Sequence, residues 1–140
     1  MPFCSSELEA LFAAMLEKAD CPGASVELTL LDDAAMEILH GRSLGCSGPT
    51  NILAFPVKPP PHASVNTDTC IGSLALSVDT LRRECFLYGQ DLRVHCIRLL
   101  AHGLTHLMGY DHGPAMDALA ALLEQTAMEA AEAPSSHSAS

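Results

Sequence analysis

Apolar residues recur along the first thirty positions with two different spacings, which predict a helix followed by a strand. Between Ser6 and Ala19 they fall three or four positions apart, the spacing of a helix with one buried face. From Val26 to Leu30 apolar and polar residues alternate, as they do along a half-buried strand. We expect Asp32 or Asp33 to cap a short helix that ends at Leu39.

The middle of the chain predicts two more strands with a proline-rich excursion between them. A glycine-bearing loop, Gly41 to Pro49, leads into a strand over Asn51–Val57, which prolines bound. Lys58 to Thr69 holds three consecutive prolines and then mostly polar residues, which are typical of a loop. Ile71–Ser77 is the next predicted strand.

The second half of the chain predicts three helices. Asp79 is expected to cap a helix that runs to Tyr88 and stops at Gly89, and a longer helix spans about Asp91 to Met108. Pro114 suits the first turn of a last helix, which carries an apolar stripe at helical spacing. The stripe comprises Met116, Leu119, Ala120, Leu122 and Leu123.

These elements predict a single α+β domain over residues 1–126, in which a small, mostly mixed β-sheet packs against several helices. The 140 residues are 49% hydrophobic, enough for one soluble globular domain with a core of its own. From Ala127 the composition shifts to alanine, glutamate and serine, so we expect residues 127–140 to be a frayed or disordered tail.

The remaining composition bears on the compartment. No apolar run approaches the roughly 20 residues needed to cross a bilayer, and the first residues lack the positive region of a secretory signal. The six cysteines form no Cys-x-x-Cys pair, so we expect free thiols in a cytoplasmic protein, with Cys96 in a helix core.

Charge is distributed unevenly along a chain whose formal net charge is −10. Residues 1–40 hold eight acids and one lysine, whereas residues 81–110 hold four arginines and two acids. The acidic balance argues against a general nucleic-acid binder, because contacts with phosphates need a basic surface. The arginines predict either an arginine-lined groove near residues 102–112 or ordinary solvated faces paired with Glu84 and Asp91. They are Arg82, Arg83, Arg93 and Arg98.

Three histidines near the end of the long helix, His102, His106 and His112, form the most informative motif. The first two share one helix face, offset by about 40° and by about 6 Å along the axis. Gly109 favours a left-handed helix end, after which His112 can turn back towards them. Neutral imidazoles suit zinc, and three protein ligands leave a fourth position for water. The motif predicts a site for one catalytic zinc ion at the end of a central helix; the alternative is a rigid helix terminus without metal.

The same spacing matches the zinc-binding core of the metzincin proteases, in which a glutamate follows the first histidine and serves as general base. That position is Gly103 here, and a glycine can neither take nor return a proton. Gly103 therefore argues against protease chemistry but not against a metal. We expect Asp111 to orient a histidine or cap the turn, while His40 and His95 are polar candidates without a motif.

Residues 102–112 resemble the H-G-x-L-H-L-x-G-Y-D-H signature of the YbeY family of bacterial rRNA-processing endoribonucleases. The departure is Thr105, where the pattern has leucine. Upstream, residues 49–56 are similar to the family's P-T-[DN]-V-L-S-F-P block, and Ile71–Ser77 is similar to its L-G-D-I-x-I-S strand. The three blocks keep their order and spacing over about residues 28–125.

The resemblance implies a single-domain, zinc-dependent endoribonuclease that acts on single-stranded RNA in rRNA maturation and ribosome quality control. It implies His102, His106 and His112 as the ligands of one Zn²⁺ ion, and ribosomal RNA or the ribosomal subunit as partner. We expect neither DNA nor a membrane as a partner.

Two positions depart from the family's charged residues. The family's Tyr-Arg-Gly is replaced by a tripeptide centred on Leu44, and its strand aspartate is replaced by Ser73. Arg42 is the candidate to bind phosphate in place of the missing arginine. These departures keep open a catalytically weakened, zinc-containing ribosome-assembly or RNA-binding factor. The metzincin-like spacing keeps open a zinc hydrolase of a peptide or small molecule.

Overall fold

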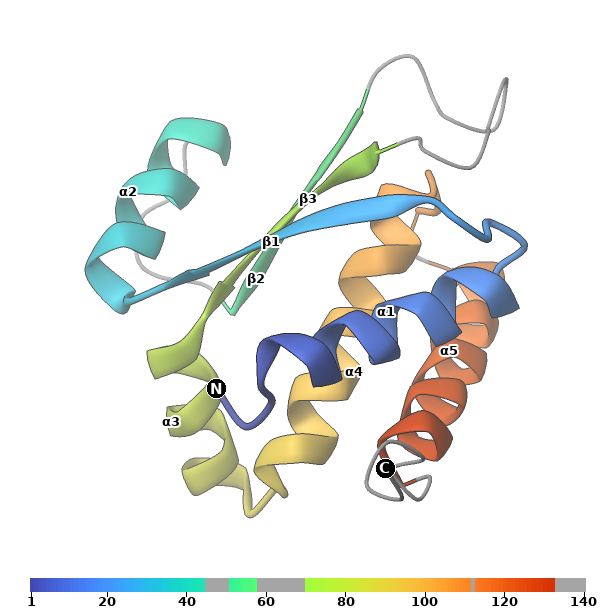
Figure 1. Cartoon of the computed structure of the whole chain (residues 1–140). Helices are drawn as coiled ribbons and strands as arrows, with labels where there is room; N and C mark the ends of the chain where they lie inside the picture. The colour runs from blue at the N-terminus through green and yellow to red at the C-terminus, as the bar shows by residue number, and fades with distance from the viewer. Residues whose placement is uncertain (45–50, 58–69, 112, 133–140) are drawn as a thin grey trace.

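The helices and strands follow in the predicted order. The computed structural model describes residues 1–44, 51–57, 70–111 and 113–132. Within these ranges the elements are α1 (Ser5–Lys18), β1 (Ser25–Leu31), α2 (Asp33–Leu44), β2 (Ile52–Pro56), β3 (Cys70–Ser77), α3 (Val78–Tyr88), α4 (Leu92–Leu107) and α5 (Pro114–Glu132) (Figure 1). None of these helices is long and apolar enough to span a bilayer.

β3 is the middle strand of a three-stranded sheet with the order β1-β3-β2. β1 runs parallel to β3, with Leu28 opposite Leu74, and β2 runs antiparallel to β3, with Ala54 opposite the same leucine. Because β1 and β3 are parallel, the chain must cross over between them, and the crossover contains α2 and β2. The predicted mixed sheet and α+β class are confirmed.

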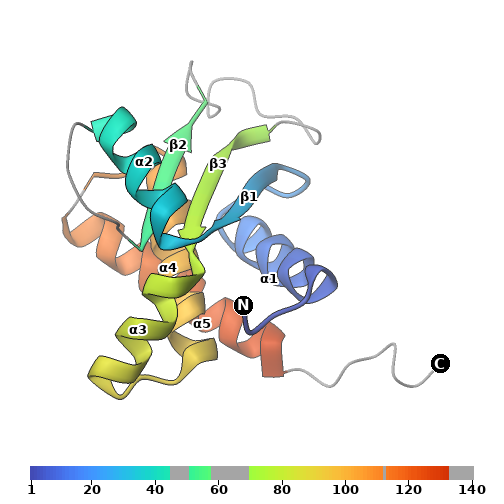
Figure 2. The ribbon, with the colours of Figure 1, turned by 90° about the vertical axis from the view of Figure 1, so that its left-hand side faces the viewer.

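Strand alternation sorts the side chains of the sheet onto two faces. Leu74 and Leu76 of β3 pack into the main core with residues of α1, α4 and α5, whereas Ala75 packs with Met36 of α2. α2 accordingly lies on one face of the sheet, and α1, α4 and α5 lie on the other (Figures 1 and 2).

α4 is the central helix, with nine of its sixteen residues buried. Asp91 caps its first turn by accepting hydrogen bonds from the backbone N–H groups of Arg93 and Val94, at 2.8 and 3.1 Å. Gly89 ends the preceding helix in the left-handed conformation, with φ 64°. The bounds predicted for these two helix ends are confirmed, and Cys96 is fully buried as expected.

Two predicted helix boundaries are wrong. α2 continues to Leu44, although a loop was expected from Gly41; an interior glycine costs a helix only about 1 kcal/mol. α5 continues to Glu132, so residues 127–132 are helical and the domain extends past residue 126. Ala127 is fully buried there, because a small side chain that favours helix can pack closely against α1. Residues 133–140 of the predicted tail lie outside the described residues.

Two side-chain assignments also need correction. Ser77, rather than Asp79, caps α3, by accepting a 3.1 Å hydrogen bond from the backbone N–H of Thr80. Asp79 instead accepts from the backbone N–H of Asp33 and so holds the start of α2, at 3.0 Å. On α5, Leu122 is 40% exposed and lies outside the buried stripe.

Candidate metal centre

Two of the three predicted ligands lie side by side on the last two turns of α4. The ring centroids of His102 and His106 are 5.1 Å apart, and the ring planes meet at 78°. Both residues are half-buried, whereas their helix neighbours Gly103, Leu104 and Thr105 are buried. The helix therefore places two imidazoles on a face that solvent reaches, as the four-residue spacing predicts.

The chain turns sharply after α4. The N–H of Gly109 donates to the carbonyl oxygen of His106 at 3.0 Å, and the N–H of Tyr110 donates to that of Thr105 at 3.2 Å. This pair of bonds is a Schellman motif, which requires the left-handed conformation that Gly109 adopts with φ 90°. Main-chain groups close the turn, so the capping role considered for Asp111 is not needed. His112 lies outside the described residues, and its place as third ligand stays a prediction.

Close packing between α4 and the sheet explains Gly103. A Cβ atom at this position would lie 2.9 Å from Leu74 Cδ2 and 3.0 Å from Ile52 Cδ1. Position 103 therefore faces the sheet, and a glutamate there would have to displace the side chains of Leu74 and Ile52. Packing against the sheet therefore explains why position 103 is a glycine rather than the glutamate that serves as general base in metzincins.

Gly72 performs the matching role on the strand. A Cβ atom there would lie 2.7 Å from Leu107 Cδ2 and 2.6 Å from the carbonyl oxygen of Phe55, and its φ of 153° disfavours other residues. The two glycines let the last turns of α4, which carry both histidines, approach β2 and β3 closely.

Ser73 and Leu44 are the two positions that depart from the family pattern. Ser73 lies away from the histidines, and the side chain of Leu44 is outside the described part of the structure. Ser73 has the same parity in β3 as Ala75, so it faces α2, and its hydroxyl donates to Glu27 at 3.2 Å. The face of the sheet that carries α4 is the opposite one. The backbones of Arg42 and Leu44 belong to the last turns of α2, and their side chains lie outside the described part of the structure.

The arginine-lined groove suggested by the sequence is wrong for three of the four arginines. Arg83 binds Asp33 at 2.6 Å, and Arg93 stacks over Phe3, 4.4 Å from the ring centroid. Arg98 contacts Gln90 and Glu124 at 3.2 and 3.6 Å, and Gln90 precedes α4, so its guanidinium points away from the histidines. In the part of the chain that the structure describes, the guanidinium groups of these three arginines contact neither Glu84 nor Asp91, the acids predicted to pair with them.

Glu84, His95 and Asn51 form a polar cluster that the sequence alone does not indicate. The carboxylate of Glu84 on α3 lies 2.9 Å from His95 Nε2 on α4 and accepts from the side-chain amide of Asn51 at 3.3 and 3.4 Å. His95 Nδ1 is buried and has no partner within the described residues. The cluster joins α3, α4 and the start of β2. No local spacing signals it, because its members come from three separate segments.

Comparison with known proteins identifies the family. The family model described as Endoribonuclease YbeY matches residues 3–132. Proteins named Endoribonuclease YbeY from Nitratidesulfovibrio vulgaris and Oleidesulfovibrio alaskensis are 46% and 42% identical, covering 94% and 90% of this chain and 86% and 84% of their own lengths. The solution structure of TM1509 from Thermotoga maritima shares the fold, with a TM-score of 0.64 and 18% identity over 91% of this chain and 85% of that one. The chain belongs to the YbeY family of endoribonucleases.

Proposed function

We propose that this chain is a zinc-dependent endoribonuclease that cuts single-stranded RNA during the maturation and quality control of ribosomal RNA. The reaction class, hydrolysis of RNA, follows from the family to which the chain belongs. The observation that supports zinc dependence is the pair of neighbouring imidazoles on the last turns of α4, 5.1 Å apart.

The donor set fits zinc. Two imidazoles from one helix face, with His112 three residues beyond the left-handed turn at Gly109, supply nitrogen ligands of the kind that zinc prefers. A bound zinc ion would lower the pKa of a coordinated water to about 7 and stabilise negative charge on phosphoryl oxygens.

The protein's own residues hold the ligands in place. Gly72 and Gly103 allow α4 to sit close to the sheet, and Thr105 donates to the carbonyl oxygen of His102 at 2.6 Å within the buried side of the helix. The Schellman turn then sets the direction in which the chain leaves towards residue 112. The packing and the turn support the proposal because they restrict the movement of the helix end that carries His102 and His106.

The acidic charge of the chain favours recognition of one specific partner over non-specific binding to any RNA. A net charge of −10 disfavours binding to any phosphate backbone it meets. Recognition would therefore depend on a defined partner, for which we propose the ribosomal subunit or its RNA. DNA is not proposed as a substrate.

The test is a paired measurement of zinc content and of cleavage of a single-stranded rRNA fragment. We expect wild type to bind about one zinc ion and cut RNA, and His106→Ala to lose the metal and about 100-fold or more of its cleavage rate, since even residues that only support a ligand contribute 10–100-fold. His40→Ala, on α2 across the sheet, is the matched control and should keep both. Undiminished cleavage by folded His106→Ala contradicts the proposal.

A catalytically weakened RNA-binding factor is the second candidate, because Ser73 and Leu44 replace charged residues of the family pattern. The position of Ser73, bonded to Glu27 on the face away from α4, favours the active enzyme. The weakened factor would be supported if the wild type binds rRNA without cutting it and Leu44→Arg gains cleavage. Position 103, packed against the sheet, disfavours a peptide hydrolase.

A further inference from the structure

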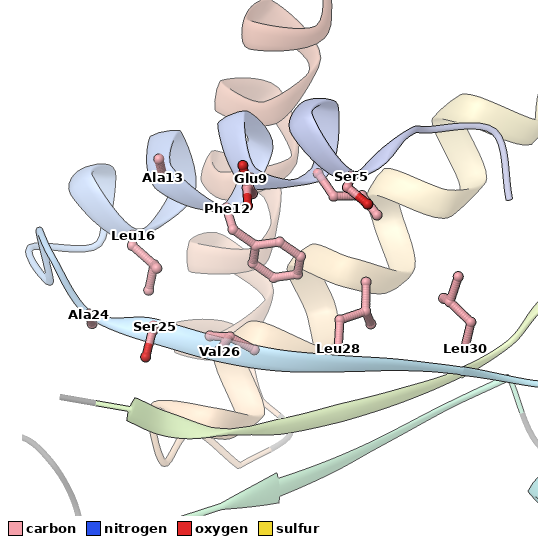
Figure 3. A pocket seen from close by; sticks show the side chains of 11 residues that line it. Ser5, Glu9, Phe12, Ala13, Leu16, Ala24, Ser25, Val26, Leu28 and Leu30 are labelled. Atoms are coloured by element: carbon pink, nitrogen blue, oxygen red, sulfur yellow. The ribbon is translucent and has the colours of Figure 1, made fainter. Parts of the chain in front are cut away.

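An open groove runs between α1 and β1 (Figure 3). It has a volume of about 550 Å³. Phe12 of α1 faces Val26 and Leu28 of β1 across it, and Leu8 and Leu30 add to its apolar lining. Leu30 is 43% exposed, so the apolar lining is not closed by the residues that the structure describes.

One wall of this groove is a free strand edge. β1 is an outer strand of the sheet and pairs only with β3 within the described residues. It is seven residues long and contains neither lysine nor proline, the residues that commonly protect an exposed edge. Its unpaired N–H and C=O groups can therefore accept another strand, whose alternate side chains would enter the groove.

The acidic charge around the groove indicates what kind of segment binds there. Residues 5–31, which build both walls, hold five acids and one lysine, and Glu9 is the charged residue among those lining the groove. Two copies of this face would repel each other. The chain's own last eight residues, Ala-Pro-Ser-Ser-His-Ser-Ala-Ser, contain no lysine, no arginine and no large apolar residue, so they suit the groove poorly.

We propose that the free edge of β1 and the adjoining groove bind an extended, basic segment of a partner protein. The segment adds to the sheet as a fourth strand, places apolar side chains between Phe12 and Leu28, and places lysine or arginine near Glu9. This docking surface is independent of the histidine site and does not rest on the proposed nuclease function.

The probe is a nine-residue peptide that alternates valine and lysine, titrated into isotope-labelled full-length protein while backbone amide shifts are followed by NMR. We expect shifts concentrated in β1 and α1. A peptide that alternates valine and glutamate should not bind. The valine–lysine peptide methylated on alternate backbone nitrogens should not bind either, because it cannot hydrogen-bond to the strand edge.

Two variants locate the contact. Glu9→Lys should weaken binding by about threefold to fivefold, the range of a partly exposed ion pair, whereas Glu17→Lys on the same helix should leave it unchanged. Leu30→Lys, at an exposed position that tolerates a charge, should abolish binding with the fold and RNA cleavage unaltered. Shifts concentrated outside β1 and α1, equal binding of the methylated peptide, or sedimentation that shows this edge already paired with a second copy would each overturn the proposal.

Discussion

Single glycines decide where the two described histidines of α4 can stand. Gly103 is the residue that a comparison with metalloproteases marks as a missing base, yet physically it is a contact point between helix and sheet. Gly72 provides the opposing contact, so neither position is free to acquire a catalytic side chain. Gly109 differs from both, because a Cβ there would meet no atom of the described residues within 4 Å and only its left-handed φ of 90° requires glycine.

Gly109→Ala therefore tests the need for a left-handed backbone at this position, because the added methyl group would not overlap with described atoms. We expect the free energy of unfolding to fall by about 1 kcal/mol, the usual cost of a side chain in left-handed backbone, and zinc affinity to fall as well, since the turn leads to residue 112. Gly89→Ala is the matched control: it also ends a helix with positive φ and open space, but far from the histidines. Urea unfolding and zinc titration of both variants check this, and equal zinc affinities would show that the turn does not position a ligand.

At the scale of elements, one carboxylate joins α2 to α3. Asp33 Oδ1 accepts from the hydroxyls of Thr80 and Ser77 at 2.9 and 3.1 Å, and Oδ2 binds Arg83. The hydrogen bond from Thr80, helped by those from Ser77 and Arg83, holds the pKa of Asp33 below its ordinary value of 3.8. Asp33 thus joins two helices through residues 44 to 50 positions away in the sequence, whereas a helix cap joins residues only two or three positions apart.

The lowered pKa of Asp33 makes the link between α2 and α3 sensitive to acid. Because the folded state favours the ionised carboxylate, its stabilisation is fully present above about pH 4 and is lost as the pH falls through the lower folded-state pKa. We expect Asp33→Asn to melt at a lower temperature than wild type at pH 7, with the difference shrinking towards pH 2. Glu37→Gln, an exposed position on the same helix, should match wild type throughout. A constant difference across this range would mean that the carboxylate's charge contributes nothing.

Local signals predicted the elements well because their causes are local. Apolar spacing together with capping and stop residues located the eight elements of the described residues, and Asp91, Gly89 and Gly109 marked helix ends through bonds made within a few residues. The errors arose where distant packing decides. Ala127 is buried only because α1 lies against α5, and Asp79 is drawn from its own helix to the backbone of Asp33.

The candidate site divides in the same way. The pairing of His102 with His106 follows from helix periodicity alone, and it is confirmed. The contact of Glu84 with His95 and Asn51 depends on how α3, α4 and β2 meet, which no spacing in one segment records. The engaged arginines show the same limit, since Asp33 and Glu124 are 50 and 26 positions from their partners Arg83 and Arg98.

At the scale of the whole molecule, α4 couples the site to global stability. It contacts β2, β3, α3 and α5, and its buried residues belong to the main core that also includes α1. A ligand that binds the end of α4 only in the folded state must therefore stabilise the entire domain rather than one turn. Zinc held by the three histidines, if supplied at 100 times its dissociation constant, would add about 2.7 kcal/mol to the free energy of unfolding.

Metal removal tests this coupling without reference to RNA. We expect the urea midpoint of wild type to fall when EDTA is added and to recover when excess zinc is restored, with about 2.7 kcal/mol as an upper value because cysteines and histidines of the unfolded chain also bind zinc. His106→Ala should unfold at the same midpoint with and without EDTA, whereas His40→Ala should respond as wild type does. If wild type and His106→Ala respond alike, the metal is held elsewhere. The stability of the fold would then be independent of the histidines on α4, even if RNA cleavage proved to require them.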